Sequence, residues 1–262
     1  MTGHAVLCAK NLSKKFPLPG KRNAFHQAVD DVSISLSAGE VYGLLGESGS
    51  GKSTVGRMVT GLTAPDSGSV EYAGVDLCTL SRKERRRFAA DIQMIFQDSS
   101  AAFDDRNTVA RILQEPLVIN GIGTAAERRA RASEALELVG LPQSFLARYP
   151  HMMSGGQRQR LNIARALILD PKVLVCDEPV SALDVSVQAN ILNLLKELQR
   201  SRNLSMIFIT HDVRVARFMS DCVGVMCKGR LVEEGTPDQV IEHPKDAYTV
   251  SLISAIPDFE RE

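Results

Sequence analysis

One stretch of this 262-residue sequence decides its fold: Gly46-Glu47-Ser48-Gly49-Ser50-Gly51-Lys52-Ser53. It follows an apolar, strand-like run at residues 41–45 and precedes a pattern typical of a helix. A glycine-rich turn between a strand and a helix predicts a phosphate-binding loop, because glycines free the backbone N–H groups to surround phosphates. In such a loop Lys52 supplies positive charge, and the Ser53 hydroxyl is a ligand for Mg²⁺.

Outward from this loop, short β-rich runs alternate with helical patterns. The runs lie at residues 32–36, 92–96, 173–176, 207–209 and 223–227. This alternation predicts an α/β fold with a largely parallel sheet. Apolar residues between 187 and 198 form a one-sided stripe typical of a packing helix. The run at 223–227 is followed by Lys228-Gly229 and a second apolar run, which predicts a hairpin and then a short helix.

The middle of the chain has a different pattern. From about residue 108 to residue 149 there is no strand signal. Thr124 and Glu127 fit a capping box that begins a helix, and Gly140 is a suitable end for it. This region is predicted to be an inserted helical subdomain.

Composition excludes several classes of protein. Lys plus Arg and Asp plus Glu are both 31, so the formal net charge is zero and nothing favours nucleic acid as a partner. No apolar run approaches the roughly 20 residues of a membrane-spanning helix, and residues 1–4 do not begin a secretory signal. The five cysteines show no Cys-x-x-Cys spacing, which predicts reduced thiols.

Two carboxylates end the run at residues 173–176, namely Asp177 and Glu178. The carboxyl edge of an α/β sheet is where such folds bind ligands. A strand ending in two acids is common and more often begins a solvated loop. Downstream of a phosphate-binding loop, however, the pair predicts a hydrolysis site, with Asp177 on Mg²⁺ and Glu178 as the general base.

A second glycine-containing helix start is Ser154-Gly155-Gly156-Gln157. Ser154 and Gln157 fit a capping box, so one interpretation is simply a well-capped helix. The two glycines favour an anion-binding site instead, because they allow a ligand to approach a helix N-terminus, where free N–H groups attract anions. The sequence therefore predicts two nucleotide-binding surfaces.

These motifs, with Ser181-Ala182-Leu183-Asp184 and Thr210-His211-Asp212, resemble those of ABC ATPases in kind and order. The resemblance spans nearly the whole chain. It implies an α/β P-loop NTPase core of the RecA-like type, with an N-terminal antiparallel β subdomain and an inserted α-helical subdomain. The expected single ABC ATPase domain, residues 1–262, has its core at 1–97 and 165–240, its helical subdomain with the signature turn at 98–164, and a C-terminal extension at 241–262.

The resemblance also implies a head-to-tail dimer with ATP and Mg²⁺ between the phosphate-binding loop of one subunit and the Ser154–Gln157 turn of the other. Gln97 then contacts Mg²⁺ and the attacking water, His211 contacts the γ-phosphate and orients Glu178, and Asp184 communicates across the dimer. Without the resemblance, Gln97 is a polar loop residue, His211 a helix cap and Asp184 a helix-start acid. The implied nucleotide contacts are Gly46, Ser48, Gly49, Ser50, Gly51, Lys52, Ser53, Thr54, Ser154, Gly155, Gly156, Gln157 and Asp184.

The adenine contact has competing candidates. Phe16 matches the place where the family stacks an aromatic ring on the base. Phe25 and His26 are alternatives, and Phe16 could instead pack beneath the N-terminal strands. The sequence leaves these possibilities open.

Several segments are similar to importer ATPases of the oligopeptide, dipeptide and nickel group: residues 91–98, 108–109, 114–116, 184–188 and 243–257. This similarity implies a peripheral subunit at the cytoplasmic face of the inner membrane. It would energise import of peptides, nickel or a related solute through two permease subunits fed by an extracytoplasmic solute-binding protein. Residues 99–106 depart from the family pattern in the segment expected to face the membrane subunit, so the solute stays open.

Two further expectations concern the type of dimer and the class of protein. Because the chain ends at Glu262 without a cysteine-containing tail, it resembles the second member of a two-ATPase pair, and we expect a heterodimer rather than a homodimer and no tail metal site. The alternative classes are an ABC ATPase acting on DNA or ribosomes and a regulator that does not hydrolyse ATP. The short insert and neutral charge disfavour the first, and the presence of both Glu178 and His211 disfavours the second.

Overall fold

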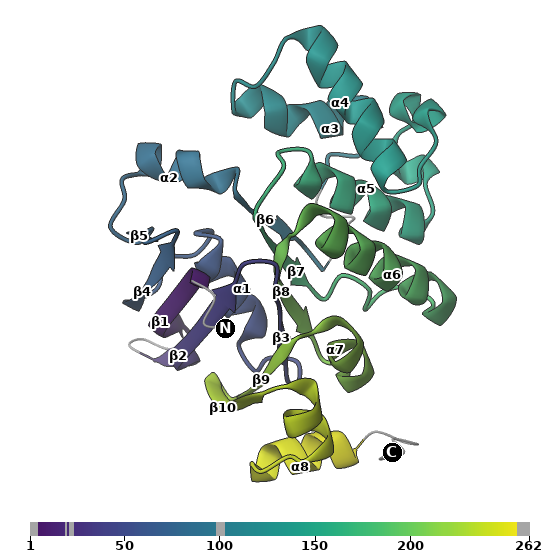
Figure 1. The fold of residues 1–262 in the computed structure, drawn as a ribbon. Coiled ribbons are helices and arrows are strands. Elements are labelled where there is room, and N and C mark those ends of the chain that lie inside the picture. Colours follow the sequence, from purple (N-terminus) through teal and green to yellow (C-terminus); the bar gives the residue numbers. More distant parts are fainter. Residues whose placement is uncertain (1–4, 19, 21–23, 98–102, 256–262) are drawn as a thin grey trace.

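The computed structural model describes residues 5–18, 20, 24–97 and 103–255, which form two sheets with helices around them (Figure 1). Two of the segments discussed above lie partly outside the described residues. They are the predicted membrane-facing stretch, at 98–102, and the C-terminal extension, at 256–262.

The smaller sheet is antiparallel throughout and has the strand order β2-β1-β4-β5. Its strands are β1 (Ala5–Pro17), β2 (Phe25–Ser37), β4 (Ser67–Tyr72) and β5 (Val75–Asp76). Strand β1, which pairs with β2, buries Leu7 and Ala9 by alternation, and a register shift after Ala9 brings Leu12 to the core as well. The predicted N-terminal antiparallel β subdomain is confirmed, and the strand predicted at 32–36 extends well beyond those bounds.

The larger sheet has the strand order β10-β9-β3-β8-β7-β6. Its strands are β3 (Val41–Leu45), β6 (Ile92–Ile95), β7 (Val173–Asp177), β8 (Ser205–Thr210), β9 (Cys222–Cys227) and β10 (Arg230–Gly235). All neighbours pair in parallel except β10, which closes the predicted hairpin with β9. The prediction of a largely parallel sheet is confirmed.

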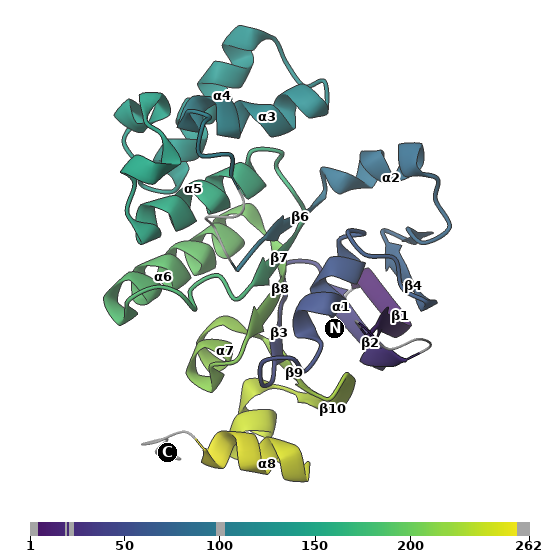
Figure 2. The same cartoon turned by 180° about the vertical axis from the view of Figure 1, so that it is seen from behind.

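Helices cover this sheet and extend from it. They are α1 (Lys52–Val59), α2 (Arg82–Ala89), α5 (Gly155–Leu167), α6 (Val185–Arg202), α7 (Val213–Met219) and α8 (Ala247–Ser254). Figures 1 and 2 place the yellow α8 at the end of the molecule opposite the teal helices. A π-helical turn, Asp238–Glu242, connects β10 with α8.

The helical subdomain contains α3 (Val109–Ile119), α4 (Ala125–Leu138) and two 3-10 turns, Gln143–Ala147 and Pro150–Met152. Its predicted capping box is present: Glu127 Oε2 accepts the N–H of Thr124, and Thr124 Oγ1 accepts the N–H of Glu127. Gly140 follows the end of α4 in the left-handed region, at φ 70°. The boundary predicted between residues 164 and 165 falls inside α5, which continues to Leu167.

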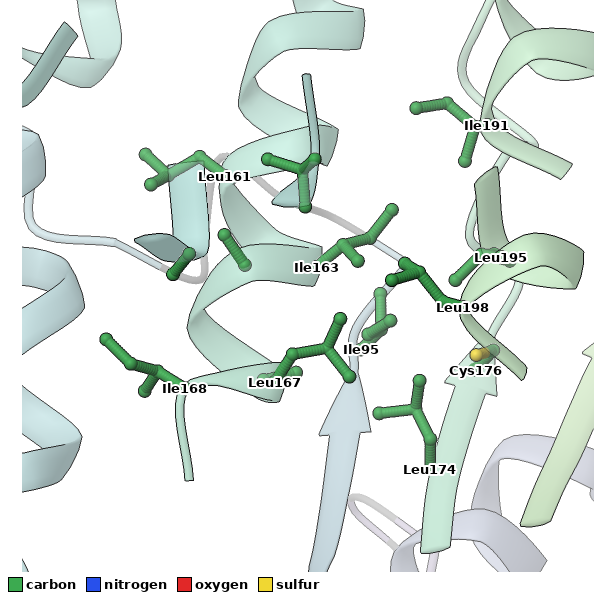
Figure 3. Packing of buried hydrophobic residues seen from close by; sticks show 14 of the residues in the cluster. Ile95, Leu161, Ile163, Leu167, Ile168, Leu174, Cys176, Ile191, Leu195 and Leu198 are labelled. Carbon is green, nitrogen blue, oxygen red and sulfur yellow. The ribbon is translucent and has the colours of Figure 1, made fainter. Parts of the chain in front are cut away.

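The main core lies where α5 and α6 meet the sheet (Figure 3). Leu167 of α5 and Leu195 of α6 pack around Ile95 and Cys176 of the strands. The predicted stripe on α6 is buried at Ile191, Leu195 and Leu198. Burial raises the pKa of the Cys176 thiol, in accord with an apolar role, and all five cysteines are free.

Among the described residues, no helix is both long and apolar enough to cross a bilayer.

A substitution at the centre of β8 tests this core. Phe208 is 0% exposed, whereas Phe218 on α7 is 43% exposed. We expect Phe208→Ala to lower the free energy of unfolding by about 3–5 kcal/mol, because it removes a buried ring and leaves a cavity. Phe218→Ala, the matched control, should cost less than about 1 kcal/mol. Denaturant unfolding measures both, and equal losses would contradict the assigned core.

Candidate active site

The site forms where parallel strands end at one edge of the large sheet. In the strand register, Leu45 of β3 lies opposite Thr210 of β8, and Ile209 of β8 lies opposite Asp177 of β7. The segments that follow these strands carry the phosphate-binding loop, Glu178 and His211. Residues more than 160 positions apart in the sequence, such as Ser48 and His211, thereby line one cavity.

The phosphate-binding loop depends on its glycines. Gly51 is the N-cap of α1 and has φ 105°, in the left-handed region that side chains disfavour. A Cβ atom there would lie 2.3 Å from the carbonyl oxygen of Ala28. The loop therefore packs too closely against β2 for any other residue at this position.

Lys52 is buried and points back into the loop. Its Nζ donates to the carbonyl oxygens of Gly46 and Glu47, at 2.7 Å each, and lies 3.3 Å from Ser50 Oγ. Burial lowers the pKa of Lys52, and the neighbouring carboxylates of the site oppose this effect. The ammonium group is thus held where a phosphate surrounded by the loop would meet it.

Asp177 and Ser53 are brought together as predicted. Ser53 Oγ donates to Asp177 Oδ1 at 2.7 Å, joining the start of α1 to the end of β7. Burial raises the pKa of Asp177, whereas the hydrogen bond from Ser53 lowers it. These two oxygen atoms, one of them from a buried carboxylate, are of the type that Mg²⁺ prefers.

Glu178 is the centre of the site. Its Oε2 accepts a hydrogen bond from Gln97 Nε2 at 3.0 Å and lies 3.1 Å from His211 Nδ1. The Glu178 side chain is 11% exposed and that of His211 54% exposed. The backbone of Glu178 has φ 45°, an unusual conformation for a side-chain-bearing residue that is typical of functional sites. The backbone N–H of Glu178 donates a hydrogen bond to the carbonyl oxygen of Ile209 at 3.0 Å.

Neighbouring residues explain why Gln97 and His211 can both reach Glu178. Asn162 of α5 donates through Nδ2 to the carbonyl oxygen of Phe96 at 3.3 Å, which fixes the residue before Gln97. His211 does not cap α7, since Asp212 accepts the N–H groups of Arg214 and Val215. The ring of His211 is therefore available to Glu178.

A cavity of about 720 Å³ opens over these groups. Its lining is Glu47, Ser48, Gln97, Glu178, Ser181, Ala182, His211 and Leu252. Sequence reasoning did not assign Leu252 to the site, and no local pattern could have done so, because it arrives on α8 from the far end of the chain. Ser181 and Ala182 were recognised only as part of a family motif.

The Ser154 turn lies elsewhere and does not contribute to the described lining of this cavity. Its capping box is present, with Ser154 N–H donating to Gln157 Oε1 at 3.0 Å. Close packing also explains the glycine at position 156, since a Cβ there would lie 2.6 Å from Val187 Cγ1 on α6. Asp184, at the N-cap of α6, is exposed and makes no side-chain cap. Ser154 and Asp184 are both exposed in this chain.

The adenine candidates lie on the β1–β2 hairpin. Phe16 is paired opposite His26, and Phe25 opposite Pro17. Phe16 is 40% exposed and Phe25 is 60% exposed, so Phe16 is not buried beneath the strands. Lys14 Nζ lies 5.8 Å from the centroid of the Phe16 ring. The assignment of Phe16 to adenine stays a prediction.

This geometry agrees with comparisons to known proteins. Residues 29–181 match the family profile described as ABC transporter. The chain belongs to the ABC transporter family. It is 47% identical over 255 residues to the dipeptide transport ATP-binding protein DppF of Lactococcus lactis, covering 96% of this chain and 81% of the relative. It is 45% identical over 250 residues to the oligopeptide transport ATP-binding protein OppF of Streptococcus mutans, covering 95% and 80%.

Among solved structures, the fold is similar to a dimeric ATP-binding cassette in a post-hydrolysis state bound to ADP and Pi. The TM-score is 0.79 at 30% sequence identity, over 88% of this chain and 98% of that one. The chain is therefore an ABC ATPase that binds ATP, with the predicted P-loop NTPase core. The roles assigned to individual site residues stay predictions.

The close approach at Gly51 can be tested in this ABC ATPase. Gly51→Ala should weaken ATP binding about tenfold or more, because the new Cβ atom collides with the Ala28 carbonyl and displaces the loop. Gly74→Ala is the matched control: Gly74 has φ 80°, but a Cβ there would meet nothing within 4 Å. Titration calorimetry measures the affinities, and comparable losses in both variants would contradict the steric account.

Proposed function

We propose that this ABC ATPase energises the import of peptides by binding and hydrolysing ATP. ATP hydrolysis is supported by one observation: Gln97 and His211 both contact the carboxylate of Glu178 beside the phosphate-binding loop. The names of DppF and OppF support peptides as the solute class. Nickel, the other solute suggested by the sequence, stays an untested prediction.

In the proposed reaction, the loop from Gly46 to Thr54 holds the phosphates of ATP. The start of α1 presents backbone N–H groups, which attract anions through free donors and the helix dipole. Lys52 exchanges its bonds to loop carbonyls for bonds to phosphate oxygens, and charge makes the new bonds stronger. Phe16 stacks on adenine from the β1–β2 hairpin.

Ser53 and Asp177 are the proposed protein ligands of Mg²⁺, with Gln97 nearby as a third oxygen donor. The described residues contain no cluster of three or more His, Cys, Asp or Glu side chains that could hold a metal by themselves. Mg²⁺ sites in nucleotide enzymes commonly use one or two protein oxygens and take the remainder from phosphates and water, which fits this pair. When bound, Mg²⁺ neutralises charge on the phosphates.

Glu178 acts as the general base that accepts a proton from the attacking water. Its carboxylate is held from two sides, by the amide of Gln97 and the ring of His211. A base held in place before the reaction loses less entropy on reaching the transition state. The low exposure of Glu178 also limits competition from bulk water.

The proposed assembly is a head-to-tail dimer in which the Ser154–Gln157 turn and Asp184 of each subunit complete the site of the other. A heterodimer with a second ABC ATPase is favoured over a homodimer. This pair would lie at the cytoplasmic face of the inner membrane beneath two permease subunits, fed by an extracytoplasmic solute-binding protein. Within this arrangement, the proposed helical subdomain is the predicted segment 98–164 together with the end of α5, which continues to Leu167, and residues 241–262 are the proposed C-terminal extension.

Removing the proposed base tests the reaction. In the complex with its partner subunits, Glu178→Gln should lower ATP turnover about 100-fold or more while ATP affinity is retained, because the amide cannot accept the proton. Glu197→Gln, on the exposed side of α6, is the matched control and should leave both unchanged. Hydrolysis assays and nucleotide titration measure the two quantities. Normal turnover by Glu178→Gln would show that another group is the base.

A further inference from the structure

The C-terminal helix α8 touches the phosphate-binding loop. The N–H of Glu47 donates to Tyr248 Oη at 3.2 Å, a contact between residues separated by 201 positions in the sequence. One turn further along α8, Leu252 lines the same cavity as Glu178 and His211. Figures 1 and 2 both show α8 below β9 and β10, the strands at one edge of the large sheet.

The position of α8 is fixed by hydrogen bonds at its start. Asp246 is the N-cap and accepts the N–H groups of Tyr248 and Thr249, at 2.8 Å and 3.4 Å. The carboxylate of Glu233 on β10 accepts the N–H groups of Lys245 and Asp246, at 2.9 Å and 3.0 Å. The helix is therefore anchored to the sheet before its first turn.

Two faces of α8 have different surroundings. Thr249 and Ile253, four residues apart, are fully or almost fully buried, and Ile253 joins the cluster that contains Leu45 at the end of β3. Tyr248 and Leu252 form the adjacent i, i+4 pair and are only partly buried. The buried pair thus holds the helix in place, and the other pair faces the nucleotide site.

We propose that Tyr248 is a positioning residue of the ATP site, whose hydroxyl holds the phosphate-binding loop through the N–H of Glu47. The loop is glycine-rich, so without external contacts it samples many conformations. A hydrogen bond from a rigidly anchored helix reduces this freedom before ATP arrives, and binding then costs less ordering. The inference rests on the proposed role of residues 46–54 in holding phosphates.

The chemistry of the hydroxyl suits this role. Burial raises the pKa of Tyr248, and the hydrogen bond from Glu47 opposes that effect only in part. The phenol is therefore neutral at physiological pH, and its oxygen remains an acceptor for a backbone N–H group. Phenylalanine has the same ring without the acceptor, so Tyr248→Phe removes this single contact.

In Tyr248→Phe, hydrogen exchange at the Glu47 amide should be faster than in the wild type, and affinity for ATP should fall about threefold to tenfold, as expected for one lost hydrogen bond. In the assembled complex, KM for ATP should rise with little change in kcat, because Tyr248 does not touch Glu178. Tyr72→Phe is the matched control, because it removes the same atom from Tyr72 on β4 of the small sheet, whose hydroxyl bonds to Asp91 in the turn before β6. This variant should change none of these quantities.

The outcomes separate this inference from the proposed function. If the wild type binds ATP and Tyr248→Phe binds it equally well, the positioning role is wrong and the nucleotide site stands. If the affinity falls but exchange at Glu47 is unchanged, the effect does not run through this contact and the inference fails. If the wild type does not bind ATP, both the proposed function and this inference fail.

Discussion

The hydrogen-bonded register of three parallel strands is the constraint on which the rest depends. Because β3, β8 and β7 are aligned with Leu45 opposite Thr210 and Ile209 opposite Asp177, their carboxyl ends meet at one edge. A shift of one residue would turn every side chain to the other face of the sheet. The phosphate-binding loop, the Asp177–Glu178 pair and His211 all follow from this alignment, since each begins where one of these strands ends.

Around that edge, several groups of the site are held by neighbours from distant parts of the chain. Ser53 holds Asp177, Gln97 and His211 hold Glu178, and Tyr248 holds the backbone of Glu47. Such contacts arrange the site before substrate binds, which is the main way a protein lowers the barrier to phosphoryl transfer. The unusual backbone conformation of Glu178 persists because the surrounding strands and loop determine it.

Features set by neighbouring residues could be predicted from the sequence. The phosphate-binding loop, the capping boxes at Thr124 and Ser154 and the β9–β10 hairpin all depend on short spacings, and all are present. Contacts between distant segments could not be predicted from local patterns. The approach of Gly156 to Val187 and the arrival of Leu252 in the cavity require the folded chain. The site residues were recognisable as a set only through their resemblance to a family.

The most direct test of a role in transport is an affinity purification of the tagged chain from gently solubilised membranes of its source cell, with mass spectrometry of the bound proteins. We expect to recover two membrane subunits and a second ABC ATPase, and the identity of the membrane subunits would point to the solute. Recovery of ribosomal or DNA-bound proteins in place of membrane subunits would contradict a role in transport.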